Sequence, residues 1–177
     1  MDALFEEIYE KYHLDIFQFL FYLVRDRHKA EDLTQEVYIR VLKSIDRFEH
    51  RSSLKTWILA IARNVAIDHF RKEKTKRNFF MSQLEEKGFD VQDHEKIPEE
   101  IAIQKDEIRL LYRCLKACTL DQQTVLIARF IQDLSIAETA EILGWTESKV
   151  KTTQHRAIRN LKKFMEATSE KEGGQHE

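Results

Sequence analysis

The chain has 177 residues, which is long enough for one ordinary domain or two small ones. A single proline and four glycines argue against a β-sandwich or barrel, and helix-forming residues occur throughout, so we predict an all-α fold. The formal net charge of −2 conceals two mildly basic blocks on either side of an acidic stretch at residues 78–107, so whole-chain charge says little about what either block binds.

The first block is predicted to hold three helices. Residues 2–23 repeat apolar side chains at helical spacing, which is typical of an amphipathic helix. The segment 46–53 lacks such a stripe and offers Ser52 and Ser53 as caps for a third helix, which is predicted to end near Arg77. A second amphipathic helix is predicted between the first helix and this segment. Its inward side chains are Leu33, Val37, Val41 and Leu42, and its outward side chains include Asp32, Gln35, Glu36 and Arg40.

The third predicted helix carries an aromatic ring, an amide and a guanidinium on one side, because Trp57, Asn64 and Arg71 are seven residues apart. Such a set can stack on an unpaired base and hydrogen-bond to it. The alternative is a core tryptophan beside a merely exposed asparagine. Spacing alone does not decide between these two interpretations.

Beyond Arg77 the helical periodicity fades and acidic residues accumulate, which predicts a linker over residues 78–98. Pro98 suits the first turn of a helix that is expected to extend to about Ala117, and another helix opens near Leu120. These elements begin a second block over residues 99–168. The remaining residues, 169–177, are predicted to form a frayed polar tail.

Cys114 and Cys118 lie four residues apart on one predicted helix, a spacing that would allow both to bind one metal ion. Without a nearby histidine or second cysteine pair, we instead expect small buried core residues with free thiols, and no metal. The chain has an acidic start where a signal peptide is basic, and its apolar runs are too short for a membrane span. A cytoplasmic location is therefore expected.

A helix-turn-helix is predicted near the end of the second block. Ser135 and Glu138 have the spacing of a capping box, Gly144 suits a left-handed turn, and Thr146 is placed to cap the following helix. The outward face of that helix carries Lys151, Thr152, His155, Arg156 and Arg159. Such side chains can contact DNA phosphates or base edges, although an ordinary packed helix with a solvated polar face gives the same pattern.

Two separate motifs resemble one known family. The sequence "AEDLTQEVYIRVLKSIDRFEHRSSLKTWILAIARNVAIDHFRK" closely resembles region 2 of the extracytoplasmic-function (ECF) sigma factors of bacterial RNA polymerase, and residues 111–165 resemble their region 4. This resemblance covers nearly the whole chain. It implies two small helical domains, region 2 over residues 1–77 and region 4 over residues 99–168, joined by the acidic linker.

The resemblance also implies what the residues do. In this family one helix docks on the clamp helices of the polymerase β′ subunit. The positions of this chain that match it are Asp32, Gln35, Glu36 and Arg40. The surface that melts the minus 10 promoter element and captures a base matches at Arg51, Ser52, Ser53, Trp57, Asn64, Arg71 and Lys72. The positions that face the minus 35 element match at Thr146, Ser148, Lys149, Lys151, Thr152, His155, Arg156 and Arg159. Many relatives carry an aliphatic residue where this chain has Gln154.

The implied function is that of a sigma subunit, which binds core polymerase, recognises a two-part promoter, helps to open it and is then released. The implied partners are the polymerase core, through its β′ clamp helices and β flap, promoter DNA, and an anti-sigma factor, for which membrane anchoring is one option. No cofactor, metal, small-molecule substrate or enzymatic activity is expected.

Two other functions compete with this interpretation. A stand-alone helix-turn-helix activator would need a sensing domain with a ligand pocket or receiver-type βα units, and the first block shows no such pattern. A small helical enzyme would need a convergent nucleophile, base and metal set. Asp68 and His69 are adjacent and therefore point to different faces of their helix, which argues against a catalytic pair.

Overall fold

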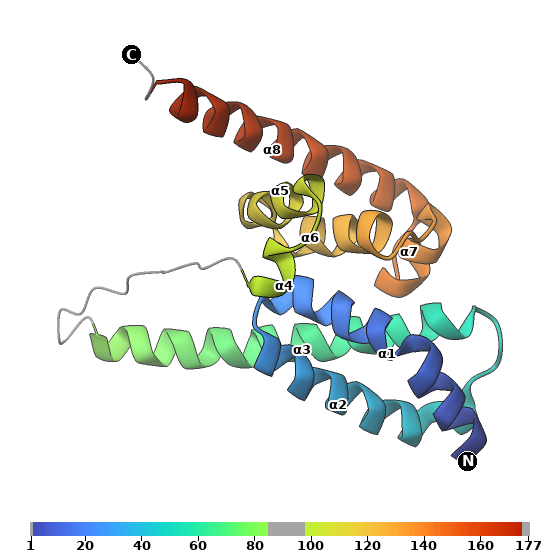
Figure 1. The fold of residues 1–177 in the computed structure, drawn as a ribbon. Helices are drawn as coiled ribbons and strands as arrows, with labels where there is room; N and C mark the ends of the chain where they lie inside the picture. The colour runs from blue at the N-terminus through green and yellow to red at the C-terminus, as the bar shows by residue number, and fades with distance from the viewer. Residues whose placement is uncertain (1, 85–97, 175–177) are drawn as a thin grey trace.

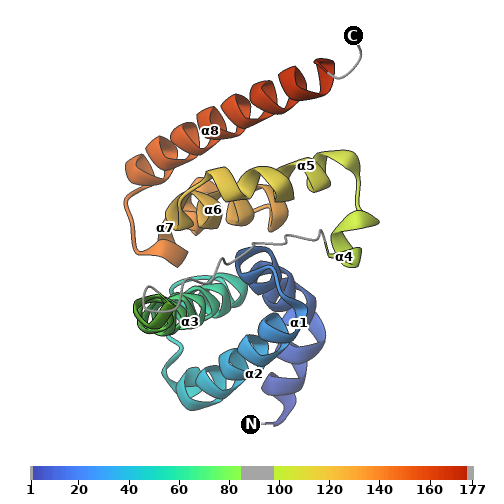
Figure 2. The same ribbon diagram turned by 90° about the vertical axis from the view of Figure 1, so that its left-hand side faces the viewer.

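The computed structural model describes residues 2–84 and 98–174. Every regular element within these two ranges is helical, which confirms the predicted all-α fold. Figures 1 and 2 show two stacked parts: the N-terminal helices lie below, and the second half of the chain lies across them with its last helix on the outer side.

The N-terminal half consists of α1 (Asp2–Val24), α2 (Arg27–Ser44), the 3₁₀ turn η1 (Ile45–Arg47) and α3 (Leu54–Leu84), and the three α-helices pack on one another. The turn between α1 and α2 is sharp because Arg25 adopts a left-handed conformation (φ 56°). Asp26 then caps α2 by accepting a hydrogen bond from the backbone N–H of Lys29 (3.0 Å). The predicted order of three helices and one loop is confirmed.

The prediction that the third helix ends near Arg77 was wrong, because α3 continues to Leu84. The sequence from 78 to 84 has no proline or glycine, and extending an existing helix costs far less than starting one. Phe79 in this extension is 66% exposed. The rest of the predicted linker, residues 85–97, lies outside the described residues.

The C-terminal half is built from short helical pieces followed by one long helix. In chain order these are α4 (Glu99–Ala102), α5 (Asp106–Cys114), the 3₁₀ turn η2 (Leu115–Ala117), α6 (Leu120–Leu126), the π-helical turn η3 (Ile127–Ile131), α7 (Ile136–Leu143) and α8 (Glu147–Gly173). The predicted frayed tail is thus helical as far as Gly173, consistent with the glutamate and lysine residues in its last turns. Residues 175–177 are outside the described part.

The single helix predicted from Pro98 to about Ala117 is instead broken into three pieces. Lys105, at the start of α5, is extended (φ −58°, ψ 154°), and acidic residues follow it in the first turn of α5, where the helix dipole favours them. The break places Ile101 in the core at 2% exposure while Ile103 stays 80% exposed. Sequence pattern missed the break because both pieces have good helix propensity.

The two halves share one continuous hydrophobic core. Phe19 of α1 and Ile58 of α3 belong to the same buried cluster as Leu126 and Ile127 of the second half. Helix α1 packs against α6 and η3, and α3 packs against α7. The two helical domains expected from the sequence are therefore packed into one body, as both ribbon views show (Figures 1 and 2).

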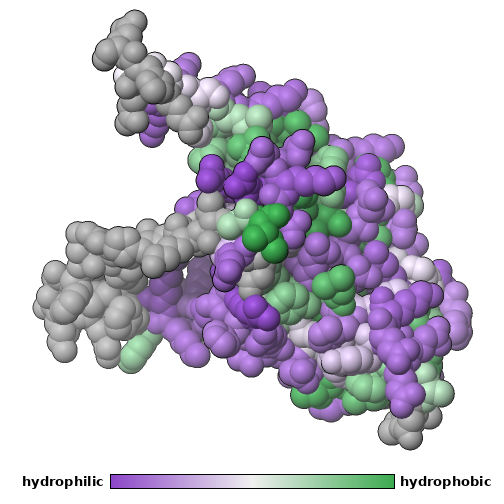
Figure 3. Space-filling model, in the orientation of Figure 1, coloured by the Kyte–Doolittle hydropathy of each residue, from purple (hydrophilic) through white to green (hydrophobic). Residues whose placement is uncertain are grey.

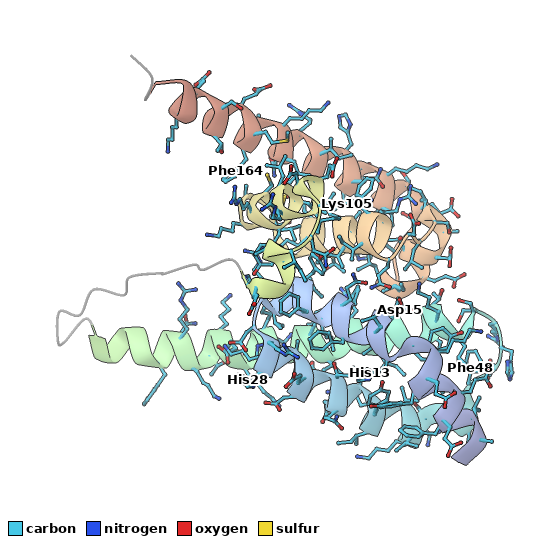
Figure 4. The ribbon with its side chains drawn as sticks, viewed as in Figure 1. His13, Asp15, His28, Phe48, Lys105 and Phe164 are labelled. Atoms are coloured by element: carbon cyan, nitrogen blue, oxygen red, sulfur yellow. The ribbon has the colours of Figure 1, made fainter. Side chains whose placement is uncertain are left out.

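A polar cluster built around the buried Gln132 lies within this interface. Gln132, which follows η3, is 4% exposed, and its Nε2 donates a hydrogen bond to the carbonyl oxygen of Asp15 on α1 (3.1 Å). Lys55 Nζ of α3 donates to the carbonyl oxygen of Gln132 (3.4 Å) and lies 3.8 Å from the Asp15 carboxylate. Asp15 lies where α1 faces the second half (Figure 4). These directed contacts help to align the two halves, because hydrogen bonds require specific partner positions.

Candidate nucleic-acid interface

The helix-turn-helix is formed by the local interactions that the sequence predicted. Ser135 Oγ accepts a hydrogen bond from the backbone N–H of Glu138, and Glu138 Oε1 accepts one from the backbone N–H of Ser135, both at 3.1 Å. Helix α7 ends at Gly144, which is left-handed (φ 66°, ψ 33°). Thr146 Oγ1 then caps α8 by accepting from the backbone N–H of Lys149 (3.2 Å).

A small core holds the two helices of this motif together. Val125 of α6, Ala140 and Leu143 of α7, and Val150 of α8 form a buried cluster. Ala140 is small enough to let α7 and its neighbours approach closely. Trp145 packs against the same cluster, and the Lys149 ammonium lies 4.0 Å from the centroid of its ring, a cation–π contact.

The outward face of α8 is exposed, as expected for a surface that binds DNA. The side chains predicted for this face, which the structure leaves exposed, are Lys151, Thr152, His155, Arg156 and Arg159. The opposite face is turned inward, with Val150 and Ala157 fully buried. Thr146, Ser148 and Lys149 are also exposed at the start of this helix, although the Thr146 hydroxyl serves its own cap.

Replacement of Gly144 by alanine is expected to lower the free energy of unfolding by about 1 kcal/mol, because a residue with a Cβ is strained in the left-handed region. A Cβ built at Gly144 meets no atom within 4 Å, so the cost is conformational rather than steric. Urea denaturation measures it. Gly173→Ala is the matched control, since Gly173 is equally open without a positive φ, and an equal loss in both variants would contradict this explanation.

The predicted base-binding residues at the start of α3 lie beside an aromatic group. Trp57 is half-buried, and its ring packs against Phe48 with 4.9 Å between centroids. Phe48 in turn lies 4.5 Å from the ring of His50. Figure 4 shows Phe48 in the turn between α2 and α3. The segment that resembles region 2 includes Phe48 and His50, but they were not predicted as contact residues, because aromatic residues in a loop without helical periodicity give only a weak signal.

The remaining residues predicted for this surface are placed as follows. Ser53 caps α3, since its Oγ accepts from the backbone N–H of Thr56 (3.1 Å) and donates to Thr56 Oγ1 (2.8 Å). Ser52 is half-buried, and Arg51 is exposed and paired with Glu49 (2.8 Å). Further along α3 three predicted side chains are exposed: Asn64, Arg71 and Lys72. Trp57 is therefore neither fully buried nor isolated, and Asn64 faces solvent.

The predicted polymerase-binding face of α2 is partly tied to α3. Asp32 and Gln35 are exposed. Arg40 is half-buried, with Nε donating to Glu36 Oε1 (3.1 Å) and Nη2 donating to Asp68 Oδ2 of α3 (2.9 Å). The Asp68 contact could not be inferred from spacing, because it joins residues on different helices.

Apolar side chains lie on the outer side of the same helix. Ile39 is 46% exposed and Leu42 is 38% exposed, and sequence reasoning assigned Leu42 inward. Figure 3 shows apolar patches among hydrophilic ones along the lower edge of the molecule, where α2 lies in Figure 1. The face of α2 therefore offers both charged and apolar contacts to a partner.

The two cysteines are core residues, as predicted. Cys114 is 1% exposed and Cys118 is 7% exposed, both thiols are free, and burial raises the pKa of each. In the part of the chain that the structure describes, no three His, Cys, Asp or Glu residues gather closely enough to hold a metal ion. The helices in the same part are also too short or too polar to span a membrane.

Comparisons with known proteins agree with this organisation. The family model of sigma-70 region 2 matches residues 8–76, and that of sigma-70 region 4 matches residues 108–161. The chain is 51% identical to the ECF RNA polymerase sigma factor SigX of Bacillus subtilis (strain 168), over 96% of this chain and 88% of SigX. It is 34% identical to the RNA polymerase sigma factor YlaC of the same organism, over 94% of this chain and 95% of YlaC.

A solved structure shares the fold. The sigma factor RpoE of Bartonella quintana, crystallised in complex with the anti-sigma factor NepR, superposes with a TM-score of 0.70. The match covers 92% of this chain and 96% of RpoE at 22% identity. A region 2 followed by a region 4 with a helix-turn-helix defines a sigma-70-type transcription factor. The chain belongs to the ECF RNA polymerase sigma factors, which favours the sigma-factor interpretation over the stand-alone activator.

Proposed function

We propose that this chain docks on core RNA polymerase through α2 and reads a two-part promoter through α3 and α8. It performs no chemistry of its own, and it acts in the cytoplasm, where the polymerase is. The observation that carries the proposal is the presence, in one chain, of an exposed basic face on the second helix of a helix-turn-helix and an aromatic group at the start of α3.

The outer face of α2 docks on the polymerase. The α2 residues that contact the β′ clamp helices are Asp32, Gln35, Glu36 and Arg40. Protein interfaces combine an apolar centre with polar contacts at its edge, and the exposed Ile39 and Leu42 supply apolar area beside these charges. Region 4 meets the β flap in this proposal. An anti-sigma factor is a further expected partner, supported by the fold shared with RpoE, which was crystallised with one.

Melting and reading of the minus 10 element fall to the start and the middle of α3. A base must leave the stack before its pairing edge can be read, and the protein has to compensate for a few kcal/mol of unstacking. Stacking on an aromatic ring contributes about 1–3 kcal/mol per base. The half-buried Trp57, supported by Phe48, offers such a ring, while Asn64, Arg71 and Lys72 offer hydrogen bonds and positive charge along α3.

Reading of the minus 35 element falls to α8. Its exposed Lys151, His155, Arg156 and Arg159 contact phosphates or guanine edges, and Thr152 contacts backbone or base. Near the start of α8, Thr146, Ser148 and Lys149 contact the phosphate backbone of the DNA. The free N–H groups at the start of a helix favour phosphate binding. Core polymerase supplies part of the non-specific affinity for DNA. A small basic face is therefore enough for promoter binding by a chain with a net charge of −2.

The promoter-bound protein has to be more extended than the structure described above. Elements at minus 10 and minus 35 are about 25 base pairs apart, which is roughly 85 Å along B-form DNA. A compact chain of this length has a radius of gyration of only about 16 Å. The two DNA-reading parts must therefore separate, which breaks the contacts of Gln132 with α1 and of Lys55 with the second half.

Transcription with purified components tests the proposed function. Added to sigma-free core polymerase, the protein is expected to produce promoter-dependent transcripts. Trp57→Ala should lower open-complex formation by about tenfold, because one stacked base is worth about 1–3 kcal/mol. The matched control is Trp57→Phe, which keeps an aromatic ring for stacking at the same position and should retain most of the activity. If no genomic template gives a transcript while the protein alone binds a specific duplex tightly, the activator interpretation replaces this one.

A further inference from the structure

Arg129 lies in η3 and connects separate parts of the helix-turn-helix. Its Nε donates a hydrogen bond to Gln154 Oε1 in the middle of α8 (3.0 Å). Its Nη1 donates to the carbonyl oxygen of Leu134, the residue directly before the Ser135 cap of α7. One guanidinium thus bonds both to the segment that starts α7 and to the side of α8.

Gln154 is well placed to transmit this contact. It lies directly before His155 and three residues after Lys151, both on the exposed face of α8. Gln154 itself is half-buried, at the boundary between that face and the inward stripe of Val150 and Ala157. A bond at this boundary resists rotation of α8 about its own axis, whereas the buried stripe mainly resists separation of the helices.

Small rotations of α8 matter for base reading. Side chains extend about 5–6 Å from a helix axis, so a rotation of about 10° moves their ends by about 1 Å. Hydrogen bonds to base edges tolerate less than that, since donor and acceptor must stay about 2.7–3.2 Å apart. An aliphatic residue at position 154 would pack without a preferred orientation. The hydrogen bond between the Arg129 guanidinium and the Gln154 amide requires a defined orientation of α8.

Resting on the proposed function, we propose that Arg129 is a positioning residue for promoter recognition. Its hydrogen bonds to Gln154 and to the Leu134 carbonyl set the rotation of α8 relative to α7, and so determine how well the exposed side chains of α8 discriminate between bases of the upstream element. Arg129 affects base discrimination through the position of α8. Its π-helical setting agrees with this role, because π turns concentrate at functional sites.

The test compares holoenzymes that contain wild-type protein, Arg129→Ala or Gln154→Leu. Initiation is measured on promoters whose upstream element is intact or carries single-base substitutions, and on a promoter that depends on the downstream element alone. Each variant is expected to reduce the preference for the intact upstream element by about tenfold, since a misdirected pair of base contacts costs about that much. Initiation on the downstream-only promoter should stay unchanged.

Three further variants sharpen the result. The double variant Arg129→Ala with Gln154→Leu should behave like Arg129→Ala alone, because the two residues act through one hydrogen bond. Arg129→Lys keeps the charge but loses the planar fork, so it should resemble Arg129→Ala. Arg113→Ala, which removes an exposed arginine on α5, is the matched control and should leave the preference unchanged.

Several outcomes would overturn the proposal. Equal loss of initiation at every promoter, including the downstream-only one, would make Arg129 a residue of general stability. A plot of the logarithm of the DNA-binding constant against the logarithm of the salt concentration has a slope that reports phosphate contacts. If Arg129→Ala lowered the magnitude of this slope by about one, Arg129 would be a direct phosphate contact. If Arg129→Ala does not fold, the proposal is tested by Gln154→Leu alone. Leucine fills about the same space as glutamine but cannot accept the hydrogen bond from Arg129. Failure of the proposed function would appear separately, as absence of promoter-dependent transcripts with the wild-type protein.

Discussion

A covalent cross-link between the two halves is expected to abolish transcription from promoters that carry both elements. Cysteines at Leu14 and Asp133, joined by a short bis-maleimide, would hold α1 against the turn after η3. Both positions are exposed, and their neighbours Asp15 and Gln132 are hydrogen-bonded to each other at 3.1 Å. The linked protein cannot separate its DNA-reading parts by the roughly 85 Å that the two elements require.

Run-off transcription with core polymerase measures this effect. Each single-cysteine variant, treated with the same reagent, is the control, and each should retain activity. The wild-type thiols of Cys114 and Cys118 are buried with raised pKa values, so they react slowly and do not confuse the result. A cross-linked protein as active as the single variants would show that initiation does not require the halves to separate.

Truncation of Phe19 to alanine is expected to lower the free energy of unfolding by about 3–5 kcal/mol. Phe19 is fully buried in the cluster that both halves share, so the cavity weakens the whole molecule rather than one domain. Urea denaturation measures the loss. Leu143→Ala is the comparison, since Leu143 belongs to the separate small cluster of the helix-turn-helix.

The two tryptophans report the two halves separately. Trp57 is in the first half and Trp145 in the second, so variants with one tryptophan replaced by phenylalanine give one fluorescent probe each. With Phe19→Ala, both probes should show the same shift of the unfolding midpoint. A shift seen only by Trp57 would mean that the shared core does not couple the halves.

The features predicted correctly are those whose structure is decided by local interactions. The capping box of Ser135 and Glu138, the left-handed Gly144 and the Thr146 cap were all predicted and are all present. Each of them involves residues within a few positions of one another, so spacing in the chain equals spacing in the structure. Helix ends without such signals were less well predicted, as at Leu84 and at the break before Asp106.

The candidate site shows the same division. Exposure of Lys151, His155 and Arg156 on one face of α8 follows from helical periodicity alone. By contrast, the bond from Arg129 to Gln154 joins residues 25 positions apart, and the bond from Arg40 to Asp68 joins residues 28 positions apart. Neither pairing leaves a periodic signal in a single sequence, and the roles of the predicted contact residues in promoter and polymerase binding stay predictions.

The all-α class, the helix-turn-helix and the family were predicted from the residues alone, because helical periodicity, caps and motif order are properties of short stretches of chain. The shared core of the two halves, the burial of Gln132 between them and the bond from Arg129 to α8 became evident only from the folded molecule. These features depend on which helix faces meet. That choice is made by shape and by hydrogen-bond partners distant in the chain, whose contacts form only when the helices pack.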